Sequence, residues 1–216
     1  MKISVITVVR NNADTIADTL RSITAQTHPD IEHIVIDGAS ADGTLEIVKR
    51  LGNRGTKILS EPDYGIYDAM NKGIALATGD VIGFLNADDI YADESVLTQV
   101  AQVMEDSSTD ACYADLVYVD RKDTDRIVRY WKSRPYEAGL FEKGWLPAHP
   151  TFYARRRVYE RYGGFDTRFR IQSDFELAMR FLHIHHIRSI YIPHIWVRMR
   201  MGGVTNRRII DVIRGN

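Results

Sequence analysis

Cysteine is almost missing from this chain of 216 residues, because Cys112 is the only one. A single cysteine excludes an internal disulfide and a zinc site built from cysteines. The sequence also has no apolar run of about 18 residues, the length that a membrane-spanning helix needs. The short apolar run after Met1 lacks a small-residue cleavage pattern, so we read it as a first strand and not as a signal peptide. We therefore expect a cytoplasmic protein.

Glycine-rich phosphate loops are missing as well. The turn after the first apolar run, VVRNNADT at residues 8–15, contains no glycine. This excludes the pyrophosphate cradle of dinucleotide-binding enzymes, and the P-loop pattern of many nucleotide-binding proteins is also absent. A nucleotide diphosphate bound by this chain would therefore need a divalent cation, Mg²⁺ or Mn²⁺, held by oxygen ligands to neutralise its phosphates.

The net charge of −1 conceals an asymmetry along the chain. Residues 1–120 carry 8 Lys and Arg against 20 Asp and Glu, a net charge of −12, whereas residues 121–216 carry 20 against 9, a net charge of +11. An acidic half suits metal chemistry, and a basic half suits phosphates, an anionic membrane surface or nucleic acid. The two halves could equally neutralise each other across a shared surface. Because no recognisable nucleic-acid-binding module accompanies the basic residues, we expect no nucleic-acid partner.

Strand and helix patterns alternate through the first 120 residues. Runs rich in β-branched residues alternate with segments whose apolar residues recur at helical spacing, as Ile16, Leu20 and Ile23 do. This order implies a mostly parallel sheet that is covered by helices on both faces. We expect strands at 3–9, 31–38, 56–60, 80–86 and 110–120, and helices at 13–26, 41–50, 65–77 and 94–106.

The pattern is less regular after residue 120, and no convincing linker or repeat divides the chain. We therefore expect one domain over residues 1–216, with functional halves at 1–120 and 121–216. In the second half we expect strands at 126–131, 188–193 and 195–201, a short helix at 135–144, a strand and a helix within 149–166, and a helix at 173–184 capped by Ser173.

Polar side chains follow each of the first four expected strands. In open α/β sheets, ligands bind at the carboxyl ends of the strands, so these side chains should converge on one crevice. Asp and Asn also favour ordinary turns and helix N-caps. Several carboxylates gathered without cations would be costly, however, which favours a bound metal ion. The residues concerned are Asn11, Asn12, Asp37, Glu61, Asp63, Asn86, Asp88 and Asp89.

Several separate segments, in register with one another, resemble family 2 glycosyltransferases, which have the GT-A fold. The resemblance covers about residues 1–206 and implies an α/β fold: a Rossmann-like, mostly parallel central sheet with helices on both faces and a smaller acceptor-side half. The segments are SVITVVRNNADTIADTLRSITAQTHPDIEHIVIDGASADGT (4–44), SEPDYGIYDAMNKGIALATGDVIGFLNADD (60–89), HPTFY (149–153), YGGFD (162–166), SDFELAMR (173–180) and MGGVTN (201–206).

The resemblance implies transfer of a sugar from a nucleotide-activated donor, a UDP- or dTDP-sugar, with inversion at the anomeric carbon. Asp88 matches the metal-binding last aspartate of the family's DXD motif. Asn86 stands where that motif usually has its first aspartate, which removes one negative charge and predicts weaker binding of Mn²⁺ or Mg²⁺. The nucleotide-binding residues that the resemblance implies are Thr7, Val9, Asn11, Asp37, Asp63 and Asn86.

The acceptor side is implied by the second half of the resemblance. Asp174 matches the catalytic base, and a helix start would keep its carboxylate ionised, although plain first-turn capping needs the same residue there. His149 matches a histidine of the acceptor-side half. Trp145 lies on an expected loop, where it could stack on an acceptor sugar or pack over the core.

The expected activity is that of a non-processive, inverting hexosyltransferase, because the QxxRW motif of processive polymer synthases is absent. The expected acceptor is a saccharide or a lipid-linked molecule in cell-surface polysaccharide biosynthesis. The basic half then suggests peripheral attachment to the inner face of the cell membrane. A different reading is a catalytically weak sugar-nucleotide-binding or scaffold protein of a polysaccharide assembly, because Asn86 weakens the DXD motif.

Overall fold

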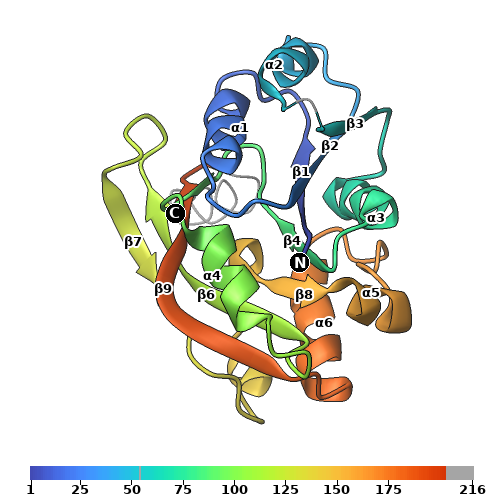
Figure 1. Cartoon of the computed structure of the whole chain (residues 1–216), viewed down its shortest axis with the longest axis vertical. Coiled ribbons are helices and arrows are strands. Elements are labelled where there is room, and N and C mark those ends of the chain that lie inside the picture. The colour runs from blue at the N-terminus through green and yellow to red at the C-terminus, as the bar shows by residue number, and fades with distance from the viewer. Residues whose placement is uncertain (54, 203–216) are drawn as a thin grey trace, which may run out of the picture.

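Four parallel strands form the first part of the central sheet (Figure 1). They are β1 (Ile3–Val9), β2 (Ile31–Asp37), β3 (Lys57–Ser60) and β4 (Val81–Phe84), in the spatial order β3-β2-β1-β4. Each lies where the sequence predicted a strand. The structure, a computed structural model, describes residues 1–53 and 55–202.

Helices cover both faces of this sheet, as the sequence predicted. In β1, Ile3 and Val5 pack with residues of α1 (Ile16–Thr24) and α4 (Val96–Val103). Ile6 and Val8, which point to the opposite face, pack with α3 (Ile66–Leu76), α5 (Arg156–Tyr162) and α6 (Ser173–Met179). The alternation follows from the two-residue period of a strand. Helix α2 (Thr44–Leu51) lies on the α1 face.

The second part of the sheet differs from the expected order. The strand predicted at 110–120 is β6 (Ala111–Val119), but it does not pair with β4. The short strand β8 (Tyr153–Arg155) lies between them, antiparallel to both. β6 also pairs with β7 (Ile127–Trp131) and with β9 (Ser189–Arg200). β9 pairs in turn with β5 (Ile90–Tyr91), a short strand that the sequence did not predict. Pairing between distant strands leaves no local periodic signal, so the insertion of β8 could not be read from the sequence.

The two strands predicted at 188–193 and 195–201 are one strand, β9. Its register against β6 shifts between Ile192 and Ile195, which face Ala114 and Asp115. Pro193 lies in this shift, and proline has no N–H to donate to a ladder. The proline therefore interrupts the hydrogen-bond pattern without ending the strand.

Two further predictions about the second half are wrong. Only Phe141–Lys143 is helical within 135–144, as a single 3₁₀ turn. Helix α6 begins at Ser173, but its N-cap is Gln172, and the Ser173 hydroxyl donates to the backbone oxygen of Asp166 at 3.0 Å. A π-helical turn, Arg180–Ile184, continues α6.

One sheet contains strands from both sides of residue 120, so both expected halves contribute to it. The single domain over residues 1–216 stays a prediction, and the last four residues of MGGVTN, 203–206, lie outside the described part of the chain. Among the helices of the described residues, none has the length and apolar character that crossing a membrane requires.

Candidate active site

The carboxyl ends of the parallel strands lie at one edge of the sheet. Val9 at the end of β1 faces Asp37 at the end of β2, and Asp37 faces Ser60 at the end of β3. The Leu85 N–H after β4 donates to the backbone oxygen of Ile6 at 3.0 Å, so the chain leaves β4 at this same edge. The polar residues that the sequence singled out are therefore brought together, as the parallel topology requires.

Asp37 organises the loop that follows β2. It is fully buried, and its carboxylate accepts hydrogen bonds from the Ser60 hydroxyl at 2.7 Å and from the Ser40 N–H at 3.2 Å. The exposed Asn11, with φ +50°, reaches the same loop, because its side-chain oxygen accepts the Ala41 N–H at 2.9 Å. These contacts tie the ends of β1, β2 and β3 together. Contact of Asp37 and Asn11 with a nucleotide stays a prediction.

Asp63 lies directly over the backbone of Gly38. A Cβ added to Gly38 would meet Oδ2 of Asp63 at 2.2 Å, so only glycine permits this approach. The other oxygen of Asp63 accepts the Gly65 N–H at 2.9 Å, just before α3 begins. The carboxylate thus joins the loop after β2 to the start of α3.

Thr7 and Val9 are buried inside the sheet rather than exposed at its edge. Thr7 is fully buried, and its hydroxyl lies 3.0 Å from Nε2 of His33 on β2. Burial lowers the pKa of His33 to about 4, so this imidazole is neutral near pH 7. Val9 is 6% exposed, and its backbone oxygen accepts the Gly38 N–H at 2.8 Å. Thr7 and Val9 are thus placed to support the loops at this edge. Direct contact of either residue with a nucleotide stays a prediction.

The residues Asn86–Asp89, which we name the NADD turn, hold buried oxygens without partners. Oδ1 of Asn86 and both carboxylate oxygens of Asp89 have no hydrogen-bond partner among the described residues. Burial raises the pKa of Asp88, while Arg200 and Arg121 oppose this rise. Burial and the adjacent Asp88 charge hold the pKa of Asp89 well above its usual range. Favourable interactions with the Arg200 backbone N–H, the Asn86 side chain and the Arg200 charge oppose this rise only in part. Acidic oxygens buried in this way are costly unless a cation approaches them.

Two arginines beside the NADD turn were not singled out by the sequence. Arg200, 5% exposed at the end of β9, donates to the backbone oxygen of Asp88 at 3.1 Å and to the Asp18 carboxylate of α1 at 2.5 Å. Arg121 follows β6 and contributes a second positive charge near Asp88. The pairing of β6 with β9 brings both to this edge, so no local pattern could have identified them.

The oxygen atoms of the NADD turn are of the type that a hard divalent cation prefers, but there are few of them. Carboxylate and amide oxygens are the ligands that Mg²⁺ and Mn²⁺ prefer, and the turn offers three that lack partners. Within the described residues, 1–53 and 55–202, no group of three or more His, Cys, Asp or Glu is arranged to hold a metal ion. Mg²⁺ is usually bound through one or two carboxylates together with substrate phosphates. The turn therefore fits a cation that shares its ligands with a bound diphosphate.

Asp174 lies in the first turn of α6 and faces two side chains from other elements. The Tyr67 hydroxyl donates to its Oδ1 at 3.1 Å. His149 is half-buried, Nε2 of its imidazole is buried without a partner among the described residues, and the charge of Asp174 acts on it. Burial lowers the pKa of His149, and the negative charge of Asp174 partly opposes this effect. The predicted base and the predicted acceptor-side histidine are thus neighbours.

An aromatic group connects Asp174 to the NADD turn. The His149 ring lies 5.3 Å from the ring of Phe84, the last residue of β4, and 5.4 Å from that of Phe165. Phe84 and Phe165 pack edge to face at 5.4 Å. We name these three residues the aromatic bridge. Phe84 lies two residues before the NADD turn, and His149 interacts with Asp174, so packed aromatic rings connect the turn to the predicted base.

Trp145 packs in a second aromatic cluster. Its ring lies within 6.0 Å of Tyr113, Tyr136 and Phe141, and its indole Nε1 is buried without a partner among the described residues. This arrangement favours packing over the core, one of the two alternatives that the sequence left open. Stacking on an acceptor sugar stays a prediction.

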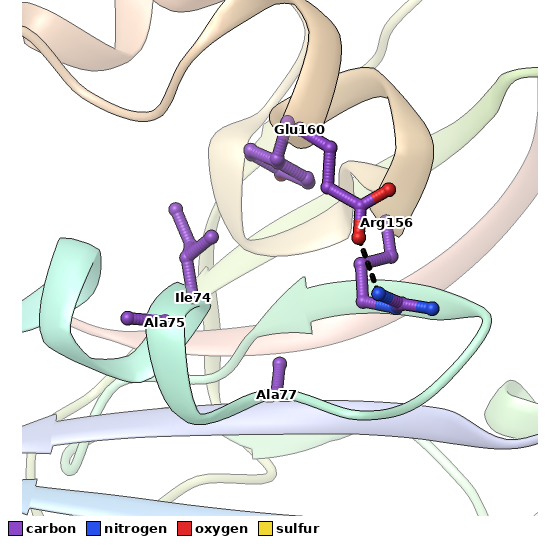
Figure 2. Close-up of a pocket in the computed structure, with 6 residues that line it drawn as sticks. Ile74, Ala75, Ala77, Arg156 and Glu160 are labelled. Carbon is purple, nitrogen blue, oxygen red and sulfur yellow. Dashed lines mark hydrogen bonds and ion pairs between the residues drawn. The ribbon is translucent and has the colours of Figure 1, made fainter.

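One cavity lies away from the NADD turn and Asp174. A cavity of about 240 Å³ lies between the end of α3 and the start of α5, and Figure 2 shows Ile74, Ala77 and the ion pair of Arg156 and Glu160 around it. The Arg156 N–H donates to the backbone oxygen of Asp80, just before β4 begins. This cavity therefore lies at the amino edge of the sheet, opposite the NADD turn.

Comparisons with known proteins give a consistent family. The sequence model of the family described as "Glycosyl transferase family 2" matches residues 4–171. A "PGL/p-HBAD biosynthesis glycosyltransferase" of Mycobacterium bovis is 31% identical over 180 residues, covering 82% of this chain and 68% of that protein. An uncharacterised glycosyltransferase of Mycobacterium tuberculosis is 35% identical over 184 residues, with the same two coverages.

Solved structures of GT-A glycosyltransferases share the fold. TarS of S. aureus has a TM-score of 0.70 at 18% identity, over 99% of this chain and 39% of that chain. The mannosyltransferase PcManGT from Pyrobaculum calidifontis, in complex with GDP-Man and Mn²⁺, has a TM-score of 0.71 at 20% identity, over 96% of this chain and 59% of that chain. This chain thus spans less than two thirds of the length of these two solved chains.

Proposed function

Because the chain belongs to glycosyltransferase family 2, we propose that it moves a hexose from a UDP- or dTDP-sugar to a saccharide or lipid-linked acceptor, with inversion at the anomeric carbon. One arrangement carries the proposal. The aromatic bridge connects Asp174 to the NADD turn, so a carboxylate that can take a proton and an oxygen-rich turn that can face a diphosphate share one edge of the sheet.

Asp174 acts as the general base in this proposal. Its carboxylate accepts the proton of the acceptor hydroxyl while that oxygen bonds to the anomeric carbon. The bond between the anomeric carbon and the diphosphate oxygen breaks, and the nucleoside diphosphate leaves with the electron pair. Attack on the face opposite the leaving group inverts the anomeric carbon. A divalent cation at Asp88 would supply Lewis-acid stabilisation of the leaving diphosphate.

The donor's base and ribose bind, in this proposal, at the loops that Asn11, Asp37 and Asp63 hold together. Solved relatives of the same fold are in complex with different nucleotides, UDP-GlcNAc in TarS and GDP-Man in PcManGT. The fold therefore leaves the nucleotide open. We base the choice of a uracil- or thymine-type pocket on Asp37 at the end of β2.

The proposed setting is cell-surface polysaccharide biosynthesis at the cytoplasmic face of the membrane. The excess positive charge of residues 121–216 supports peripheral attachment to anionic lipid. One similar protein is named for the biosynthesis of PGL/p-HBAD. A lipid-linked acceptor would place the reaction at a bilayer surface.

The test of this function is Asp174→Asn, which keeps the size of the side chain and its capacity to cap a helix but removes its basicity. The donor is the member of a UDP- and dTDP-hexose panel that raises the melting temperature most, and the assay measures UDP or dTDP release with acceptor extracts. We expect the transfer rate to fall by about 10²–10⁴-fold, with nucleotide affinity in calorimetry nearly unchanged.

The matched control is Asp30→Asn, an exposed aspartate just before β2 at the opposite edge of the sheet, which should keep wild-type turnover. Normal turnover of Asp174→Asn would show that this carboxylate only caps α6. A wild-type protein that binds a donor but releases no nucleotide with any acceptor would favour the binding or scaffold protein instead.

A further inference from the structure

Tyr67 joins the donor side of the site to the predicted base. It lies in the first turn of α3, and its hydroxyl donates the 3.1 Å hydrogen bond to Oδ1 of Asp174, which is 107 residues later in α6. In the part of the chain that the structure describes, no other side chain donates a hydrogen bond to this carboxylate. One oxygen of Asp174 is therefore fixed by a group from the opposite half of the chain.

The position of Tyr67 is itself fixed by the segment before α6. Its ring stacks on Phe165 with centroids 5.4 Å apart and an interplanar angle of 24°. One turn later in α3, the side-chain amide of Asn71 donates to the Phe165 backbone oxygen at 2.8 Å and accepts the Phe165 N–H at 2.8 Å. Gly164 permits this contact, because a Cβ there would lie 2.3 Å from the Asn71 oxygen. Helix α3 and the chain leading into Asp174 are thus held in one register.

The groups that face Asp174 define what the hydrogen bond can do. Burial and the Asp174 charge raise the pKa of Tyr67 to about 12, so its hydroxyl stays protonated and can only donate to the carboxylate. The other titratable neighbour is His149, whose pKa is lowered by burial and raised in part by the Asp174 charge. Glu176 on the same helix pairs with Arg180 at 2.8 Å. Oδ1 is therefore engaged by Tyr67, which leaves Oδ2 to take a proton.

We propose that Tyr67 is a positioning residue for Asp174, whose hydrogen bond orients the carboxylate so that Oδ2 faces the acceptor hydroxyl. This inference rests on the proposed function, because the orientation matters for turnover only if Asp174 is the base. The hydrogen bond from Tyr67 also connects the position of the base to α3, which starts three residues after Asp63. Through this connection, the orientation of the Asp174 carboxylate depends on the loop that contains Asp63.

The experiment compares Tyr67→Phe with Tyr64→Phe, a change of the same chemistry at a tyrosine that is 99% exposed. Each is made alone and combined with Asp174→Asn, and nucleotide release is measured in single turnover. We expect Tyr67→Phe to slow transfer about 10–100-fold, the value of a hydrogen bond to a charged group. Nucleotide affinity and Tyr64→Phe should match the wild type.

In the Asp174→Asn background, Tyr67→Phe should have no further effect beyond about twofold. An equal loss in both backgrounds would overturn the inference, because it means that Tyr67 acts only through packing on Phe165. Full turnover of Asp174→Asn would refute the base assignment and the proposed function with it. A slow Asp174→Asn together with a wild-type Tyr67→Phe would refute the role of Tyr67 alone.

Discussion

At the scale of single residues, Asp88 and Arg200 show how charge is balanced at the NADD turn. Arg200 is engaged by the Asp88 backbone oxygen and by Asp18, so its charge is only partly available to the acidic side chains of the turn. Oδ1 of Asn86 and the Asp89 carboxylate stay without hydrogen-bond partners in the described structure. A cation bound with a diphosphate would satisfy these oxygens, and Asp88 is the residue predicted to hold it.

The first prediction at this scale concerns metal removal. In calorimetry, chelation should weaken UDP binding to the wild type, and added Mn²⁺ or Mg²⁺ should restore it. Asp88→Ala should bind UDP weakly with or without metal, whereas Asn86→Asp should bind metal more tightly because it restores a negative charge. Asp30→Ala, at the far edge of the sheet, is the control. UDP affinity that is the same in chelator and in Mn²⁺ would point to a metal-free site.

At the scale of elements, β2 carries a buried carboxylate near each of its two ends. Asp37 at the carboxyl end orders the loops of the site, while Glu32, 4% exposed near the amino end, holds the sheet's other edge together. Glu32 accepts hydrogen bonds from Ser4 at 2.6 Å and from the Thr78 N–H at 2.7 Å, and Lys57 lies 2.7 Å away. Burial alone would raise the pKa of Glu32, but these contacts hold it well below its usual range.

The corresponding prediction links β2 to acid stability. Because the pKa of Glu32 is lower in the folded than in the unfolded protein, its contribution is complete above the unfolded value of about 4.3 and is lost as the pH falls towards the folded value. Glu32→Gln should lower the free energy of unfolding at pH 7 by about 1–3 kcal/mol, the cost of unsatisfied buried partners. Urea unfolding at pH 7 and pH 3 measures both effects.

The variant should also lose less stability than the wild type between these two pH values, since the titrating group is gone. Glu105→Gln, at an exposed glutamate just after α4, should leave both measurements unchanged. If Glu32→Gln and the wild type show the same dependence on pH, the hydrogen bonds do not favour the ionised form of Glu32.

At the scale of the whole molecule, the basic second half presents an exposed edge strand. Among the described strands, β7 pairs only with β6, and its Ile127, Val128 and Tyr130 are 57%, 52% and 48% exposed. Exposed Lys132 and Arg134 follow directly. β6 ends at Val119, which faces Arg200, so the turn into β7 leaves the sheet at the edge that holds the NADD turn. A membrane surface that met this strand would lie near the candidate active site.

The prediction is that the protein sediments with vesicles that contain anionic lipid, and that added salt reduces this binding. Each basic residue near such a surface contributes about 1 kcal/mol, so Lys132→Gln with Arg134→Gln should weaken partitioning roughly 30-fold. The same pair of changes at Lys49 and Arg50, exposed at the end of α2, should have little effect. Binding that does not depend on anionic lipid would favour a soluble acceptor.

The sequence by itself determined the elements whose signal is local. The β-branched runs gave β1 to β4 and β6, and the spacing of Ile16, Leu20 and Ile23 gave the buried face of α1, because side-chain periodicity depends only on neighbours along the chain. Parallel strands put their carboxyl ends on one edge, so the grouping of Asp37, Asp63 and the NADD turn could also be predicted.

Only the tertiary structure decided which distant segments complete the site. The insertion of β8 between β4 and β6, the approach of Arg200 to Asp88, and the hydrogen bond from Tyr67 to Asp174 join residues far apart in the chain. Nothing in the local pattern around Tyr67 distinguishes a tyrosine that packs from one that orients a carboxylate. That distinction depends on where α6 lies against α3, and this is fixed by the packing of Phe165 and the close approach at Gly164 rather than by any periodic signal.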